Sequence, residues 1–165
     1  PDIIIFGLGR YGSRLMQQLR NAGIEVLGVD FDPETIRALH KLRQPVRYGD
    51  GEDPSFLESL PLPHARWAIT TFPQWESNRA FLSALKDAGF NGRIAGVVRD
   101  ALHAEALGAA GVARVLNPFN DAADYAARSF AAEIAFEDVH GRDAAAPSPS
   151  PTPSASPPPA KEPER

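Results

Sequence analysis

Four apolar residues at positions 3–6 are followed at once by a glycine-rich segment, GLGRYG, at positions 7–12. Beyond it, apolar residues such as Leu15, Met16 and Leu19 recur at helical spacing. In a G-x-G-x-x-G turn between a strand and a helix, the first glycine permits the tight turn and the second lets a pyrophosphate approach the backbone. The third lets the helix pack closely on the strand. The segment therefore predicts a βαβ unit with an anion-binding helix N-terminus.

The rest of the chain continues this alternation of short β-branched runs and helical patterns. We expect strands at 3–6, 25–30, 46–48, 67–70, 93–98 and 114–116. We expect helices at 11–22, 33–43, 54–59, 74–88, 101–109 and 118–136. The predicted fold class is α/β, a Rossmann-like doubly wound parallel six-stranded sheet with a C-terminal crossover helix. That last helix is rich in alanine, and it either covers its own sheet or docks on a second subunit.

The C-terminal segment differs in composition from the rest of the chain. Of the 16 prolines, 8 lie between positions 147 and 165, among serines and alanines. Such a segment has too little apolar surface to offset the entropy of ordering it. We therefore expect one nucleotide-binding domain over residues 1–137 and a disordered Pro/Ser/Ala-rich tail over residues 138–165.

Charge and composition exclude several classes of protein. The net charge is −4 and the basic residues are dispersed, which disfavours nucleic acid as a partner. The chain has no cysteine, so disulfides and thiol catalysis are excluded. No apolar run reaches the roughly 18 residues of a membrane span. Because the chain starts on a predicted strand and without methionine, we expect it to be a fragment of a longer protein.

Candidate binding residues follow the first three predicted strands. Arg10 stands beside the predicted phosphate site, where it either contacts the anion or is a solvated surface arginine. Asp30 lies 18 positions after Gly12 and is predicted to bind the ribose hydroxyls, with Phe31 against the adenine. A carboxylate there would repel a 2′-phosphate, which favours NAD(H) or a plain adenine nucleotide such as AMP or ATP and disfavours NADP. Asp50 either accepts from the adenine amino group or belongs to an ordinary turn.

Together these segments resemble the regulator-of-potassium-conductance (RCK) family, also called the TrkA N-terminal or KTN domain, and most closely the domains appended to Kef-type cation:proton antiporters. The resemblance covers about residues 1–136. It rests on four segments: IFGLGRYG at 5–12, VLGVDFD at 26–32, YGDGED at 48–53 and GAAGVARVLNP at 108–118.

The resemblance implies a ligand site and a regulatory role. The residues that it implies for phosphate lie in the turn formed by Gly7, Leu8, Gly9, Arg10, Tyr11 and Gly12. It further implies Asp30 for the ribose, Asp50 and Gly51 for the adenine, and Thr70, Thr71 and Arg99 for the remaining cleft. The chain would form a homodimer through its C-terminal helix and gate an attached or associated membrane transporter from the cytoplasmic face. Two departures are Gly51, where relatives often have alanine, and the absence of a second, C-terminal ligand domain.

Catalytic or metal-binding residues are not predicted. The Tyr-x-x-x-Lys pair of short-chain dehydrogenases is absent, and the four histidines lack metal-ligand spacing. We therefore expect a regulatory module rather than an enzyme. Two alternatives stay open: a cofactor-binding fragment of an NAD-dependent oxidoreductase, and a structural dimerisation module with a constitutive nucleotide.

Overall fold

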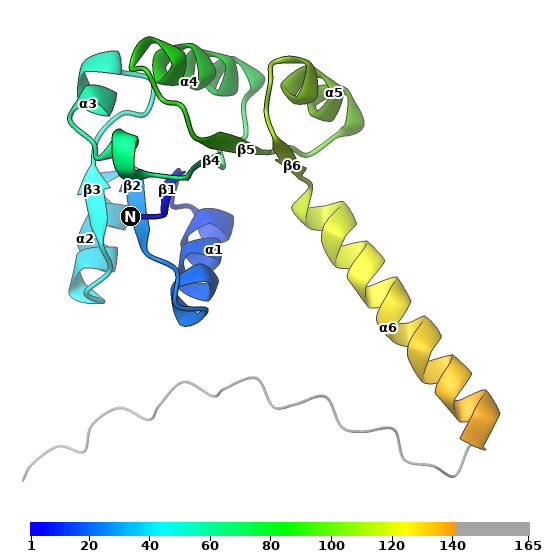
Figure 1. Cartoon of the computed structure of the whole chain (residues 1–165). Coiled ribbons are helices and arrows are strands. Elements are labelled where there is room, and N and C mark those ends of the chain that lie inside the picture. The colour runs from blue at the N-terminus through cyan, green and yellow to red at the C-terminus, as the bar shows by residue number, and fades with distance from the viewer. Residues whose placement is uncertain (141–165) are drawn as a thin grey trace, which may run out of the picture. The chain divides into compact units, whose positions relative to one another are not determined.

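The computed structural model describes residues 1–140, and at its centre is a six-stranded, all-parallel sheet (Figure 1). The strands are β1 (Ile3–Phe6), β2 (Val26–Asp30), β3 (Val46–Tyr48), β4 (Trp67–Thr70), β5 (Arg93–Val97) and β6 (Arg114–Leu116). Their order across the sheet is β3-β2-β1-β4-β5-β6, the strand order of a Rossmann fold. The predicted fold class is confirmed.

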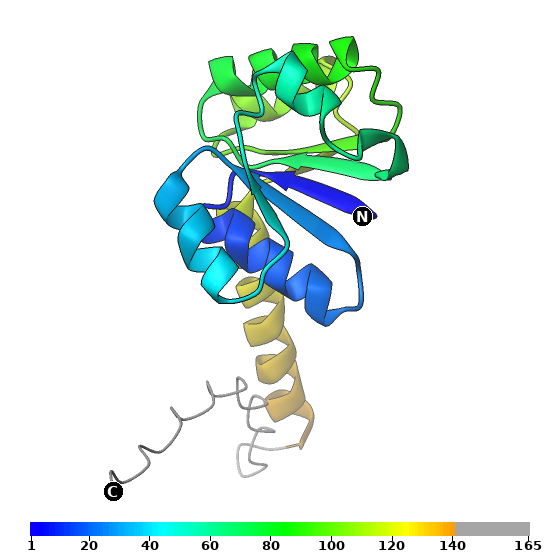
Figure 2. The same ribbon diagram turned by 90° about the vertical axis from the view of Figure 1, so that its left-hand side faces the viewer.

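Helices cover both faces of this sheet. The helices of the described chain are α1 (Arg10–Asn21), α2 (Pro33–Lys41), α3 (Pro54–Glu58), α4 (Trp75–Asp87), α5 (Ala101–Ala109) and α6 (Pro118–His140), and a 3₁₀ turn, η1 (Leu62–His64), lies between α3 and β4. Helices α1 and α2 lie on one face, and α3, α4 and α5 lie on the other (Figure 2). All four residues of β1 are buried, as expected for a central parallel strand covered on both faces.

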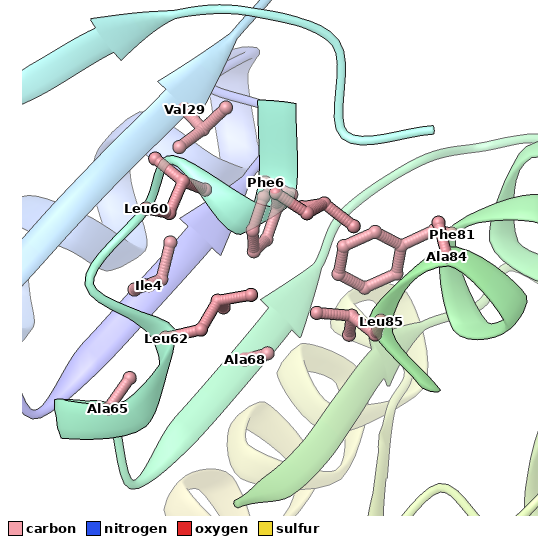
Figure 3. Close-up of a cluster of buried hydrophobic side chains, with 11 residues drawn as sticks. Ile4, Phe6, Val29, Leu60, Leu62, Ala65, Ala68, Phe81, Ala84 and Leu85 are labelled. Atoms are coloured by element: carbon pink, nitrogen blue, oxygen red, sulfur yellow. The ribbon is translucent and has the colours of Figure 1, made fainter. Parts of the chain in front are cut away.

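Side chains alternate along β1 between two apolar clusters. Ile5 packs with Met16 of α1 and Ile36 of α2 on one face. On the other face Phe6 packs against Phe81 of α4, with ring centroids 4.6 Å apart (Figure 3). The two clusters hold α1 and α4 on opposite sides of β1. As a result, the carboxyl end of β1 lies between the loops that lead into these two helices.

The predicted strands and helices are close to those observed. The ends of α1 to α5 and of the strands differ from the prediction by at most two residues. Asp32 caps α2, with Pro33 in the first helical turn. The 3₁₀ turn η1, between Pro61 and Ala65, was not predicted.

Helix α6 is longer than predicted, because it continues to His140 rather than ending at residue 136. It thereby includes the first three residues of the predicted tail, and residues 141–165 of that tail lie outside the described residues. Residues 1–123 form one compact unit, which contains the whole sheet, and the described part of α6 from Asp124 onward belongs to a second. Within residues 1–140, no helix has both the length and the apolar composition needed to cross a bilayer.

Candidate functional site

A crevice opens at the carboxyl ends of β1 and β4, where the chain changes direction across the sheet. From β1 the chain winds to β2 and β3, and it then crosses back to β4 on the other side of β1. Phe6 of β1 is level with Val29 of β2 and Thr70 of β4. The residues that follow these three meet at one edge of the sheet, at the point where open α/β folds bind their ligands.

The three glycines of the turn occupy three different environments. Gly7 has a φ of +89°, which a side chain rarely adopts. A Cβ on Gly12 would lie 1.9 Å from the carbonyl oxygen of Gly7, so only glycine lets α1 pack this close to β1. Around Gly9, in contrast, a Cβ would meet no protein atom within 4 Å. Glycine is thus required by the protein itself at positions 7 and 12, whereas position 9 faces open space.

The N-terminus of α1 has no side-chain cap. Its N-cap residue is Gly9, and no acidic residue lies in its first turn. Helices α2, α3 and α5 instead begin at aspartates, Asp32, Asp53 and Asp100, whose carboxylates accept from backbone N–H groups. The first N–H groups of an α-helix have no partner inside the helix and carry the positive end of its dipole. The first turn of α1 is therefore able to receive an anion from the crevice.

Two side chains, one at the end of β2 and one directly after β4, hold the glycine turn in place. Oδ2 of Asp30 accepts a hydrogen bond from the backbone N–H of Leu8 (2.5 Å), and its Oδ1 accepts from the N–H of Asp32 (2.8 Å). On the other side, the hydroxyl of Thr71 donates to the carbonyl oxygen of Gly7 (2.8 Å). The turn is thus preformed, and a ligand need not order it.

A cleft of about 750 Å³ lies over this turn. It extends from the loop after β2, across the turn, to the end of β5 and the first residues of α6. Its lining includes three arginines, Arg10, Arg14 and Arg99, and two aspartates, Asp30 and Asp32. Such a cleft has the size of a small-molecule site, and it offers cations for phosphate and carboxylates for hydroxyl groups.

Nine of the thirteen predicted site residues line this cleft. They are Gly7, Gly9, Arg10, Tyr11, Gly12, Asp30, Phe31, Thr71 and Arg99. Phe31 is 67% exposed, so its ring is accessible to a flat ligand. Tyr11 is partly buried, and burial followed by the negative charge of Asp121 raises the pKa of its phenol above the ordinary value. Its hydroxyl is therefore a neutral donor at physiological pH.

The structure does not place the other four along the cleft. The side chain of Leu8 is buried in the apolar cluster beneath α1 and α2. Thr70 is also buried, and its hydroxyl donates to Oδ1 of Asn78 (2.9 Å), so it stabilises the loop before α4 rather than facing a ligand. Asp50 is exposed in a turn, where its carboxylate accepts from the N–H of Glu52 (2.9 Å). Gly51 is buried beside Phe6 and Phe72, in a much smaller cavity next to the cleft.

Nine further cleft residues were not predicted. They are Arg14, Asp32, Thr35, Phe72, Pro73, Val97, Val98, Pro118 and Phe119. Arg14 could have been found, because residues four apart on a helix share a face and it follows Arg10 by four. Pro118 and Phe119 come from the far end of the domain. A single sequence has no local signal that brings them to the glycine turn.

Comparison with known protein families shows which family the chain belongs to. The TrkA-N domain model matches residues 3–118, which include the whole sheet and every cleft residue but one. This chain belongs to the TrkA-N family. The resemblance drawn from the sequence is thereby confirmed.

Among curated relatives of this TrkA-N domain is the glutathione-regulated potassium-efflux system protein KefC of Escherichia fergusonii. The two are 31% identical over 112 residues, which cover 68% of this chain and 18% of KefC. The chain thus spans about a fifth of the length of the relatives it matches.

Solved structures have the same fold. The NAD(P)-binding domain of an exopolyphosphatase-related protein from Archaeoglobus fulgidus superposes with a TM-score of 0.68 at 27% identity, and covers 81% of this chain and 96% of that chain. The GsuK channel bound to NAD superposes with a TM-score of 0.59 at 26% identity, over 69% of this chain and 21% of that chain.

Proposed function

We propose that this TrkA-N domain is a regulatory module that binds an adenine nucleotide, NAD(H) or AMP/ATP rather than NADP, in the cleft over the glycine turn. Through this binding it controls a membrane potassium or other cation transporter of the cation:proton antiporter type. The transporter is attached to the domain or associated with it, and the domain lies at the cytoplasmic face of the membrane. It performs no catalysis.

The observation that carries this proposal is the preformed turn at the uncapped start of α1. Gly9 leaves open space in front of the helix N-terminus, and Arg10 and Arg14 line the cleft beside it. Among the described residues, the guanidinium of Arg10 has no hydrogen bond or ion pair with another side chain. A phosphate would combine charge-assisted bonds from these arginines with the backbone N–H groups and the helix dipole.

The remaining cleft residues divide between the two ends of a nucleotide. On the β2 side, Asp30 would bind the ribose hydroxyls and Phe31 would lie against the adenine. On the β5 side, Thr71 and Arg99 would contact whatever extends beyond the first phosphate. The cleft volume suits either a mononucleotide or a dinucleotide, so both are included in the proposal.

The partners follow from the relatives. KefC is named as a potassium-efflux protein and GsuK as a channel, which supports a transporter as the partner of this domain. We further propose a homodimer through α6, because this helix carries exposed apolar side chains at Phe119, Tyr125, Phe130 and Ile134. Exposed apolar surface of this kind is typical of interaction sites.

Calorimetric titration with AMP, ATP, NAD+ and NADH tests the proposal. Regulation requires that the ligands bind with different affinities or stabilise different states, since a ligand with equal affinity for all states shifts no equilibrium. We expect affinity for at least one adenine nucleotide and a clear ranking of affinities among the four ligands. If none of the four nucleotides binds, the sensor function is excluded. Equal affinity for all four nucleotides would favour a constitutive, structural nucleotide.

A further inference from the structure

The cleft contains a second aspartate, Asp32, whose position differs in kind from that of Asp30. Asp30 lies at the end of β2, and both its oxygens accept from backbone N–H groups that shape the loop. Asp32 lies two residues further on, also lines the cleft, and is the N-cap of α2. A ribose that contacted Asp30 would therefore have the start of α2 as its neighbour.

The carboxylate of Asp32 fills the N-terminus of α2. Its Oδ1 accepts from the N–H of Glu34 (3.0 Å), and its Oδ2 accepts from the N–H and the hydroxyl of Thr35 (3.3 and 2.6 Å). The Thr35 hydroxyl, then the Glu34 N–H, hold the pKa of Asp32 below its ordinary value, so the group is ionised at neutral pH. The helix N-terminus nearest the ribose end is thus already occupied by an anion of the protein's own.

From this placement we infer that Asp32 is a specificity-determining residue, which excludes adenosine ligands that carry a 2′-phosphate. The inference rests on the proposed function, because it concerns the same cleft. A 2′-phosphate carries a charge of about −1.5 to −2 at pH 7, like other phosphate monoesters. Next to Asp30 and Asp32 it would meet two carboxylates, and Asp32 would already have taken the N–H groups that could receive it.

The test compares two ligands that differ only in the group concerned, 5′-AMP and adenosine 2′,5′-bisphosphate. Their affinities for the whole chain are measured by calorimetry at low salt, and the readout is their ratio. The variant Asp32→Asn removes the charge and retains a good N-cap residue. Asp53→Asn is the matched control, because Asp53 also caps a helix ahead of a proline but does not line the cleft.

We expect the unchanged protein to bind AMP at least about tenfold more tightly than the bisphosphate, since charges a few ångströms apart near a protein surface interact by this order. Asp32→Asn lowers the ratio of the AMP affinity to the bisphosphate affinity about fivefold or more, and Asp53→Asn leaves this ratio unchanged. A higher salt concentration also lowers this affinity ratio for the unchanged protein, because salt screens exposed charges. If the role of Asp32 is purely structural, its substitution weakens the binding of both ligands equally and does not alter the affinity ratio.

Three outcomes would overturn the inference. The first is a ratio that Asp32→Asn leaves unchanged while AMP still binds, which leaves the proposed function intact. The second is an equal change in Asp53→Asn, which would point to net charge rather than to the cleft. The third is a failure of the unchanged protein to bind AMP, ATP or NAD+ at all, which removes the proposed function as well. If Asp32→Asn fails to fold, Asp32→Ser replaces it, because serine is an equally good cap.

Discussion

The carboxylate of Asp30 accepts a hydrogen bond from the backbone N–H of Leu8, at 2.5 Å, and so joins the end of β2 to the glycine turn after β1. The sequence assigned Asp30 to the ribose alone. The structure gives it a second task, because the same side chain fixes the turn that would hold the phosphate. In the proposed site, binding of the sugar and binding of the phosphate would therefore both depend on Asp30.

We predict that Asp30→Ala weakens nucleotide binding and also destabilises the domain. Loss of this carboxylate leaves two N–H groups, those of Leu8 and Asp32, without their acceptor. For a half-buried, charge-assisted pair of this kind, a decrease of about 1–3 kcal/mol in the free energy of unfolding is expected. Urea denaturation measures this decrease, and calorimetry measures affinity. Unchanged stability would show that water replaces the carboxylate.

A second prediction separates the two kinds of glycine. Gly9→Ala should fold with a stability within about 1 kcal/mol of the original, since its Cβ meets no protein atom, yet bind nucleotide at least tenfold more weakly. Gly108→Ala, at an equally open position on α5 away from the cleft, is the control and should affect neither property. Gly12→Ala should cost more than about 3 kcal/mol, because its Cβ would collide with the carbonyl oxygen of Gly7.

A third prediction distinguishes the two neighbouring threonines. Thr70→Val leaves Oδ1 of the buried Asn78 without its donor, so we expect a loss of about 1–3 kcal/mol in stability but unchanged nucleotide affinity. Thr71→Val frees the carbonyl of Gly7 inside the turn, so we expect the affinity to fall. Thermal denaturation and calorimetry on both variants give the comparison. A loss of affinity in Thr70→Val, at temperatures where it is folded, would return Thr70 to the ligand site.

A fourth prediction concerns α6. If its exposed apolar side chains form the subunit interface, Phe130→Asp should shift the protein from dimer to monomer in analytical ultracentrifugation. Leu102→Asp is the matched control, because Leu102 of α5 is at 75% even more exposed than Phe130 at 65%. Dimers that persist in Phe130→Asp, or that dissociate equally in Leu102→Asp, would argue against an interface on α6.

The elements that the sequence predicted well are those with local signals. The signal for the turn at Gly7–Gly12 lies in consecutive residues of the sequence, and the aspartate–proline pairs at 32–33 and 53–54 mark the starts of two helices. The burial of Thr70 could not be predicted, because a strand's last residue can face either a helix or the crevice, and only the packing of Asn78 decides between them. The position of Phe119 in the cleft could not be predicted. More than a hundred residues separate it from the glycine turn along the chain, and only the folding of the whole sheet brings the two together.

Native mass spectrometry of the whole chain as purified, and again after addition of AMP or NAD+, tests most directly whether the glycine turn binds an adenine nucleotide. We predict a species heavier than the protein by the mass of one adenine nucleotide per chain, whose fraction is much lower in Gly9→Ala and unchanged in Gly108→Ala. Nucleotide binding at the glycine turn would be contradicted if the protein stays free of nucleotide at millimolar AMP and NAD+, or if Gly9→Ala retains the complex in full.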